Sequence, residues 1–425
     1  MKYYTNRRLC LHLTRDTETI RAAAIMRMLL AMVLHTGFTA AGDPSCPRVR
    51  VVYQSSSPDL INQSTIGTAD NKYGMEDGIV VRTASGGFAM ICAEMHDDPK
   101  WVAMRLGVWT SHDGVAWKRH RTMRQSSGTT DGNDAHAASW GPIFAYDPTA
   151  ELWLLSYVGY RSGGHNYSGW TTNFEGVIYA ALATEPGDAG LLSDFGDSAD
   201  WRAHDQVLLT PSNFGSWYRC QGLQGTDSMY PHRLADGTWA AIVGTAHQEA
   251  SWRPATAGAG KWPVSLATAP SLRGPWTRLN PASPSRPEDA PCLNLTNGHT
   301  ENPIVSRLPA GIGSPGYLAI FDDLAAEGVG FARACSVDGL HWTQDVTDVV
   351  AVPGGVRTPF GILEMSEAEV KAHASRVDAY GVTTVERIHA EGGILAWLFY
   401  TQTTDGWERF RYAVVEMSPA RATRR

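Results

Sequence analysis

The chain has 425 residues, of which 43% are hydrophobic, 10% aromatic and 19% charged. This balance excludes a disordered or fibrous protein and indicates a well-buried globular one, and the 42 Gly and 23 Pro indicate many turns. The formal net charge of -7 offers no basic surface for phosphates, so we expect no nucleic-acid partner.

The N-terminal region has the pattern of a secretory signal. The apolar run 29–34 follows the basic segment 26–28 and precedes the small residues Thr39-Ala40-Ala41. We assign residues 26–41 to a signal peptide and interpret 1–25 as an upstream extension, with a transit peptide as the alternative. The run is too short to cross a bilayer, which takes about 20 apolar residues. We therefore expect a secreted, extracellular protein with no membrane attachment after cleavage.

Short strands are predicted along the whole chain. These segments are rich in β-branched and aromatic residues and are bounded by Gly, Asp or Pro. They are 78–82, 88–93, 152–158, 239–243, 317–321 and 394–400. A single helix is predicted over 366–374, as a surface insertion, because Ser366-Glu367-Ala368-Glu369 has the pattern of a capping box.

An Asp-Gly turn followed by tryptophan occurs twice with matching flanks. The copies are Ser111-His-Asp113-Gly114-Val-Ala-Trp117 and Ser336-Val-Asp338-Gly339-Leu-His-Trp342, and a degenerate copy ends at Trp276. Asp-Gly favours a tight hairpin turn in which both central residues have positive φ. A generic hairpin would give this match once, so its recurrence indicates outer hairpins of repeated sheets, with the tryptophan packed between neighbouring sheets.

A second repeat marks the start of an apolar strand and occurs five times. Its copies are Glu76–Val80, Trp140–Phe144, Asp227–Pro231, Glu301–Val305 and Arg357–Gly361. Five copies predict an all-β, single-domain, five-bladed β-propeller over 42–425, in which these are the innermost strands. The expected blades are 74–123, 136–209, 226–280, 299–346 and 355–417. The segment 51–53 is expected to pair with the last blade and close the ring.

The first residues of these copies form a column that we expect to face the central channel. The column is Glu76, Trp140, Asp227, Glu301 and Arg357, with Asp77 beside the first. Carboxyl groups that converge on a channel lose hydration and repel one another, so at least one pKa should rise, as general-acid catalysis near neutral pH requires. Paired carboxylates with an aromatic platform suit glycoside hydrolysis. The alternative is that these acids are solvated or cap local turns.

Other polar residues lie in less specific sequence patterns. Arg357 is expected to bind a sugar hydroxyl or to hold an acid ionised. His136 either lines the channel or is solvated on a loop. The pairs Asp97-Asp98 and Asp322-Asp323 are expected to be solvated turn acids.

The cysteines show no CxxC spacing, so no zinc or redox motif is predicted. Cys92 and Cys335 lie in apolar strands and are expected to be core thiols. Cys220 and Cys292 lie in polar segments and are the predicted disulfide. The sequons that begin at Asn62, Asn166 and Asn294 are candidate glycosylation sites, so a glycoprotein is expected.

From Tyr73 to about Met417 the chain resembles the five-bladed β-propeller glycosidases, the arabinanase, β-xylosidase, levansucrase and invertase group that includes glycoside hydrolase family 43. The resemblance implies that Asp77 is the base, that Trp140-Gly141-Pro142 is the second motif and that Glu301-Asn302-Pro303 is the acid motif. Ile143 stands where the family has its orienting Asp, a role that would pass to Asp227. Because Glu301 opens the fourth blade by our count, Asp227 is also the alternative acid.

The expected function is a secreted glycoside hydrolase that acts on poly- or oligosaccharides by paired-carboxylate acid/base catalysis. Two alternatives stay open, a non-catalytic glycan-binding propeller and a glycoside phosphorylase. The only partner expected is carbohydrate, and we expect a monomer. No cofactor or metal ligand set is predicted, which leaves open a structural cation in the channel. The residues concerned are Asp77, Glu301 and Asp227 as catalytic groups and Glu76, His136, Trp140 and Arg357 as substrate-binding groups.

Overall fold

The computed structural model describes most of the chain between residues 46 and 419. The described residues are 46–55, 60–61, 71–167, 170–183, 185–192, 195, 205–210, 223–247, 264–278, 300–309, 312, 316–322, 329–344, 349–377, 382–404 and 406–419. The leader segments, the predicted pair Cys220 and Cys292, and the sequon residues Asn62 and Asn294 lie outside them. No described helix is long and apolar enough to span a membrane.

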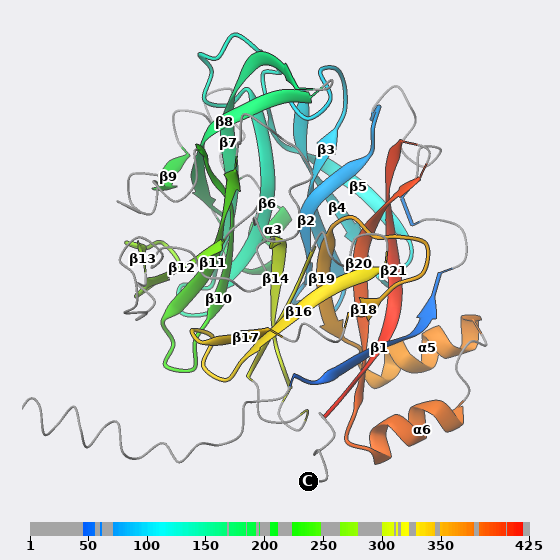
Figure 1. The fold of residues 1–425 in the computed structure, drawn as a ribbon. Helices are drawn as coiled ribbons and strands as arrows, with labels where there is room; N and C mark the ends of the chain where they lie inside the picture. The colour runs from blue at the N-terminus through cyan, green and yellow to red at the C-terminus, as the bar shows by residue number, and fades with distance from the viewer. Residues whose placement is uncertain are drawn as a thin grey trace, which may run out of the picture. The chain divides into compact units, whose positions relative to one another are not determined.

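The described strands form five blades (Figure 1). Blade 1 is β2 (Met75–Arg82), β3 (Phe88–Met95), β4 (Met104–Ser111) and β5 (Trp117–Gln125). Blade 2 is β6 (Ala138–Asp147), β7 (Leu152–Tyr167), β8 (Trp170–Leu182) and β9 (Gln206–Leu209), and blade 3 is β10 (Leu223–Arg233), β11 (Trp239–His247), β12 (Val264–Ala269) and β13 (Thr277–Arg278). Blade 4 is β14 (Glu301–Arg307), β15 (Tyr317–Asp322), β16 (Gly330–Ser336) and β17 (Trp342–Gln344), with β18 (Val350–Ala351) paired to β16. Blade 5 is β19 (Pro359–Glu364), β20 (Ile394–Thr404), β21 (Trp407–Ser418) and β1 (Arg48–Gln54).

The innermost strands close a ring. Strand β2 contacts β6, β6 contacts β10, β10 contacts β14, β14 contacts β19, and β19 returns to β2. Each of these strands overlaps one of the five repeats found in the sequence. The prediction of a five-bladed β-propeller is therefore confirmed.

The chain closes the propeller by joining its first strand to its last blade. Strand β1 pairs antiparallel with β21, with Val49 opposite Met417 and Val51 opposite Val415. Figure 1 shows the blue β1 lying against the red β21. This pairing, predicted from residues 51–53, covers the edge of β21 and makes β1 the outermost strand of blade 5.

The tryptophan of the first outer hairpin packs between two blades, as predicted. The Trp117 ring lies 5.9 Å from Phe399 and 5.4 Å from Phe410, both in blade 5. The predicted turn type was wrong, because Gly114 has positive φ but Asp113 does not. The Asp113 carboxylate instead accepts hydrogen bonds from the backbone N–H groups of Val115 and Ala116, at 2.9 and 2.8 Å. The Asp side chain thus stabilises a longer loop by an Asx turn.

Two helices extend the last blade between β19 and β20. Helix α5 (Glu367–Val377) confirms the predicted one, since Ser366 N donates to Glu369 Oε2 at 2.7 Å and Glu369 N to Ser366 Oγ at 3.3 Å. Helix α6 (Val382–Ala390), like the short α3 (Gly187–Leu192), was not predicted. Helix α6 opens with Val382-Thr-Thr-Val385, and β-branched residues favour strands.

The cysteine prediction needs one correction. Cys335 is not a core thiol, because it forms a disulfide with Cys46 across a Cα–Cα distance of 5.5 Å. This bond joins the segment just before β1 to β16 of blade 4. Cys92 is a free buried thiol, as expected.

Candidate active site at the channel mouth

Every innermost strand carries a β-bulge near its start. The pairing register shifts between residues 76 and 78, 140 and 143, 226 and 229, 301 and 304, and 359 and 361. A bulge inserts an unpaired residue and re-aims its side chain. Three of the bulges contain a residue with positive φ, namely Asp77 at 41°, Gly141 at 52° and Asn302 at 52°. The repeat in the sequence therefore corresponds to one structural device that presents side chains at the same end of each blade.

Arg357 joins three carboxylates from two other blades. Its Nε contacts Glu76 Oε1 on β2, and its Nη1 lies 3.3 Å from Glu301 Oε2 on β14 and 3.0 Å from Asp322 Oδ2 at the end of β15. Asp322 is 4% exposed, so the prediction that it is a solvated turn acid was wrong. It stands opposite Glu301 in the β14–β15 ladder, which brings both acids to the same cation.

Burial makes the first two acids of the cluster hard to ionise. Glu76 is 1% exposed and Asp77 is 7% exposed. Burial raises the pKa of Glu76 to about 8, although the positive charge of Arg357 opposes the rise. Burial raises the pKa of Asp77 well above its usual range, and the neighbouring Glu76 and Asp227 raise it further. The two adjacent carboxyl groups therefore retain protons near neutral pH.

Asp227 is brought to the same cluster from blade 3. Its Oδ1 accepts a hydrogen bond of 2.7 Å from the Tyr160 phenol on β7. Burial raises the pKa of Asp227 to about 6, against the hydrogen bond from Tyr160, and the charge of Glu301 contributes to the rise. The structure thus places Asp77, Asp227 and Glu301 within electrostatic reach of one another, as the column predicted. No described group of three or more His, Cys, Asp or Glu is arranged to hold a metal ion.

The Trp140 ring is covered by a second tryptophan. Trp101, from the β3–β4 loop, stacks on it with ring centroids 5.6 Å apart, and its carbonyl accepts from Trp140 Nε1 at 3.1 Å. Trp140 is 8% exposed, whereas Trp101 is only partly buried. Trp101 also has a φ of 74°, which is rare for a bulky residue. Trp101 therefore shields Trp140 from solvent on the stacked face.

His136 is not the solvated loop residue of the alternative interpretation. It is 7% exposed, and its ring centroid lies 4.4 Å from that of Tyr179 and 6.3 Å from that of Tyr157. Both tyrosines belong to blade 2. These ring contacts place His136 against the strands of that blade.

Sequence reasoning missed Tyr160, Asp322, Trp101 and Glu408. Glu408 of β21 is buried, and its charge raises the pKa of Glu76. Tyr160 and Glu408 lie inside strands with no local motif. The only sequence signal for Trp101 is its place in a loop between two strands of blade 1. Asp322 could have been found by predicting the pairing register of β14 and β15, because that register places it opposite Glu301.

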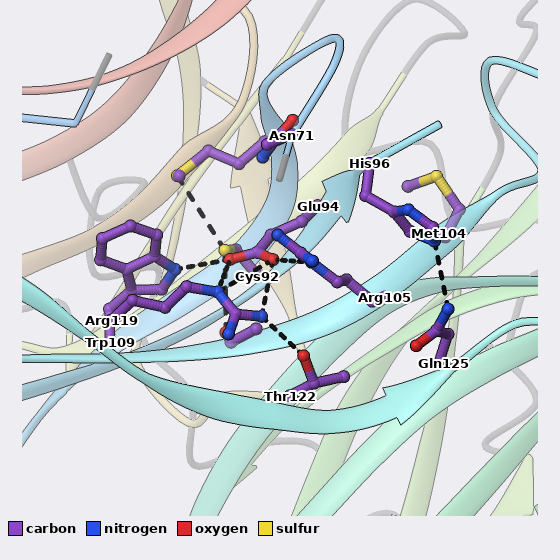
Figure 2. Close-up of polar contacts among 12 residues, drawn as sticks. Asn71, Cys92, Glu94, His96, Met104, Arg105, Trp109, Arg119, Thr122 and Gln125 are labelled. Carbon is purple, nitrogen blue, oxygen red and sulfur yellow. Dashed lines mark hydrogen bonds and ion pairs between the residues drawn. The ribbon is translucent and has the colours of Figure 1, made fainter. Parts of the chain in front are cut away.

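Glu94 on β3 is another buried carboxylate, and its negative charge is fully balanced by neighbouring groups (Figure 2). Its Oε2 lies 2.5 Å from Arg105 Nε and 3.0 Å from Arg119 Nη2. Its Oε1 accepts a hydrogen bond of 2.8 Å from Trp109 Nε1. A side chain on Gly107 would collide with the carboxylate, so glycine is required there. One acid here has two cations, whereas at the channel mouth three acids share one.

The chain resembles a solved structure in fold but has little sequence identity to it. No protein-family profile matches the chain, and no curated protein is similar in sequence. A solved structure of a complex described by the names BT0996 and RGII aligns with a TM-score of 0.50 and 12% identity over 88% of this chain and 93% of that one. A structure described as "Glycoside hydrolase" aligns at 0.49 and 12% over 88% and 93%, respectively. Zg3597, a family 117 glycoside hydrolase produced by the marine bacterium Zobellia galactanivorans, aligns at 0.47 and 12% over 88% and 91%.

Proposed function

We propose that the chain is a glycoside hydrolase whose acid/base chemistry is carried by Asp77, Asp227 and Glu301 at the channel mouth. The observation that carries this proposal is the crowding of three carboxyl groups, two of them buried, around a single Arg357. One guanidinium cannot neutralise three negative charges on Glu76, Glu301 and Asp322, so the cluster keeps protons near neutral pH. Glycoside hydrolysis needs one carboxyl group that gives a proton and a second that is ionised.

The resemblance to the propeller glycosidases assigns the roles. Glu301 is the proton donor to the leaving oxygen, and Asp77, which must first lose the proton that burial lets it keep, is the base or nucleophile on the other side of the bond. Asp227 is the third group, which is largely ionised at neutral pH because its pKa is raised only to about 6.

The two alternative functions explain less of the site. A glycan-binding module gains nothing from buried carboxyl groups that repel one another, since hydroxyl groups can be bound by ordinary amides and exposed acids. A phosphorylase needs a cation for phosphate, and Arg357 is already shared among three carboxylates. Hydrolysis is therefore the function that the described residues support best.

Several further features belong to the same proposal. The substrate is a poly- or oligosaccharide. We infer secretion from the signal-like residues 26–41, and the disulfide between Cys46 and Cys335 supports it, because such bonds persist in oxidising compartments.

The test uses the purified chain from residue 42 onward, aryl glycosides of different sugars, and the variants Glu301→Gln and Asp227→Asn. We expect Glu301→Gln to lower kcat by about 10²- to 10⁴-fold on glycosides with a poor leaving group. It should lower kcat much less on a dinitrophenyl glycoside, because that leaving group departs without a proton. Asp227→Asn should show no such dependence on the leaving group.

The outcomes separate the candidate functions. If Asp227→Asn shows the leaving-group dependence instead, Asp227 is the acid. Binding of glycans without any turnover would favour the binding module. Turnover that requires inorganic phosphate would favour the phosphorylase.

A further inference from the structure

The hydrogen bond between Tyr160 and Asp227 links two different blades. Tyr160 lies on β7 of blade 2 and is 3% exposed, and its phenol donates to Asp227 Oδ1 of blade 3 at 2.7 Å. Asp227 itself lies in the bulge of β10, where the pairing with β11 is interrupted between Thr226 and Met229. The backbone ladder therefore does not fix this residue, and a side-chain contact has to do so.

The surrounding backbone is shaped to allow this contact. Blades 2 and 3 meet at a parallel bridge between Gly176 and Gly225, and Thr226 Oγ1 donates to the Gly176 carbonyl at 2.6 Å. A Cβ at Gly176 would lie 2.5 Å from the Tyr160 ring and would also collide with the Thr226 carbonyl. On the other side, a Cβ at Gly244 of β11 would lie 3.2 Å from Asp227 Oδ2. Glycine at both positions leaves the space that Tyr160 and Asp227 occupy.

We propose that Tyr160 is a positioning residue for Asp227: its phenol holds one carboxylate oxygen in place and so stabilises the negative charge of Asp227 beside Glu301. Tyr160 acts through Asp227 and need not touch the substrate. The inference rests on the proposed function only in that Asp227 takes part in catalysis.

The charged and titratable groups around Asp227 set the direction of the effect. Burial and the charge of Glu301 from β14 oppose its ionisation, whereas the hydrogen bonds from Tyr160 and Ser228 favour it. The charge of Asp227 in turn raises the pKa of Asp77 from β2. Tyr230, on the same strand as Asp227, lies within electrostatic reach, and its hydroxyl donates to Asn302 Oδ1 at 2.9 Å. Loss of the Tyr160 hydroxyl removes a bond that favours the ionised form and leaves burial and Glu301 in place. The pKa of Asp227 should therefore rise.

The experiment compares Tyr160→Phe with Tyr157→Phe. Tyr157 is the matched control, because it lies on the same strand, is also buried and donates at the same 2.7 Å to Asp205 Oδ2, an acid paired with Arg124. The first readout is the carbon-13 NMR titration of Asp227, assigned by its loss in Asp227→Asn. The second is the pH profile of kcat on an aryl glycoside, with KM measured in parallel.

We expect Tyr160→Phe to move the titration of Asp227 to higher pH and to lower kcat about 10- to 100-fold, the equivalent of one hydrogen bond to a charged group, with KM changed far less. When Asp227→Asn is already present, Tyr160→Phe should add little. Tyr157→Phe should leave the Asp227 titration in place. An equal effect of both tyrosine variants, or an unmoved Asp227 titration in folded Tyr160→Phe, would overturn the inference. If the protein hydrolyses nothing, the NMR titration still decides it, and only the proposed function fails.

Discussion

Asp77 and Asn302 occupy equivalent positions in blades 1 and 4, since each is the bulged residue of an innermost strand with positive φ, 41° and 52° respectively. Asp and Asn tolerate this left-handed region better than other residues with a side chain, although it still costs free energy. Such strain persists only where the surrounding structure imposes it, and it is concentrated at functional sites. The backbone bulge therefore aims the carboxyl group of Asp77 into the cluster.

Asp77→Asn should abolish turnover while leaving the fold intact. Asparagine accepts the same backbone conformation, and the change removes a carboxyl group whose ionisation burial disfavours. We expect kcat to fall at least about 10²- to 10⁴-fold with the melting temperature unchanged or higher. Turnover measurements and thermal unfolding followed by circular dichroism check both parts. Asp97→Asn, at an exposed position of the β3–β4 loop, is the control and should retain activity. Near-normal turnover in Asp77→Asn would exclude Asp77 from the chemistry.

Glu94→Gln should be strongly destabilising without belonging to the site. The change leaves Arg105 and Arg119 without their shared counter-charge in blade 1. Breaking a buried ion pair costs about 3–5 kcal/mol, and we expect the lower end because both arginines are partly exposed. Urea unfolding of the variant measures this loss. Glu391→Gln, whose side chain is 54% exposed, should change the free energy of unfolding by less than about 0.5 kcal/mol. Equal stabilities of the two variants would mean that the Glu94 network contributes nothing net.

The disulfide between Cys46 and Cys335 should contribute a large share of the free energy of unfolding of the closed ring. The bond links residues 289 positions apart and joins the segment before β1 to blade 4. Replacing both cysteines by alanine should cost about 2–5 kcal/mol, with loss of pairing between β1 and β21 as the first event. Hydrogen exchange of the β1 amides measures the loss of this pairing. In the unmodified protein, peptide mapping without reductant should find no free thiol at Cys46 or Cys335. Two reactive thiols there would contradict the bond.

The fold could be predicted because its determinants repeat along the chain. The motif of the innermost strands recurs once per blade, and the Asp-Gly hairpin recurs in blades 1 and 4, so the number of blades and the closing strand follow from local patterns. The turn type was wrong because the Asp113 side chain forms its own hydrogen bonds to the backbone, which the dipeptide alone does not indicate.

The candidate site could be predicted only in part. Asp77, Asp227 and Glu301 lie at the repeated bulge and Arg357 just before the bulge of β19, and the repeat identified all four. Their hydrogen-bond and ion-pair partners lie on other strands, and a single sequence does not show which strands lie side by side. Tyr160 of blade 2, which donates to Asp227 of blade 3, is an example. Cys335 was misassigned for the same reason, since its partner is 289 residues away.

The stability of the protein should fall as pH rises from about 6.5 to about 8. Glu76 has a pKa near 4.5 when unfolded and about 8 when folded, so the folded state keeps a proton that the unfolded state has lost. The free energy of unfolding then decreases with rising pH across this interval. Asp77 acts in the same direction. His232 and His96 oppose the trend below and around pH 6.5, because burial lowers the pKa of each and protonation favours the unfolded state. The contribution of Glu76 is therefore read from the difference between variants, in which the histidine contributions cancel.

Glu76→Gln should flatten this dependence, because glutamine cannot lose a proton at any pH in the interval. The free energy of unfolding, measured in urea at several pH values, should decline less steeply from about pH 6.5 to 8 than in the unmodified protein. At the upper end the variant should gain relative stability, since the unmodified protein must there hold an ionised Glu76 that is 1% exposed. Contact with Arg357 offsets part of that cost, so Arg357→Met should steepen the decline while Glu391→Gln leaves it unchanged. If Glu76→Gln and the unmodified protein show the same slope, Glu76 is ionised throughout the interval and the cluster does not retain its protons near neutral pH.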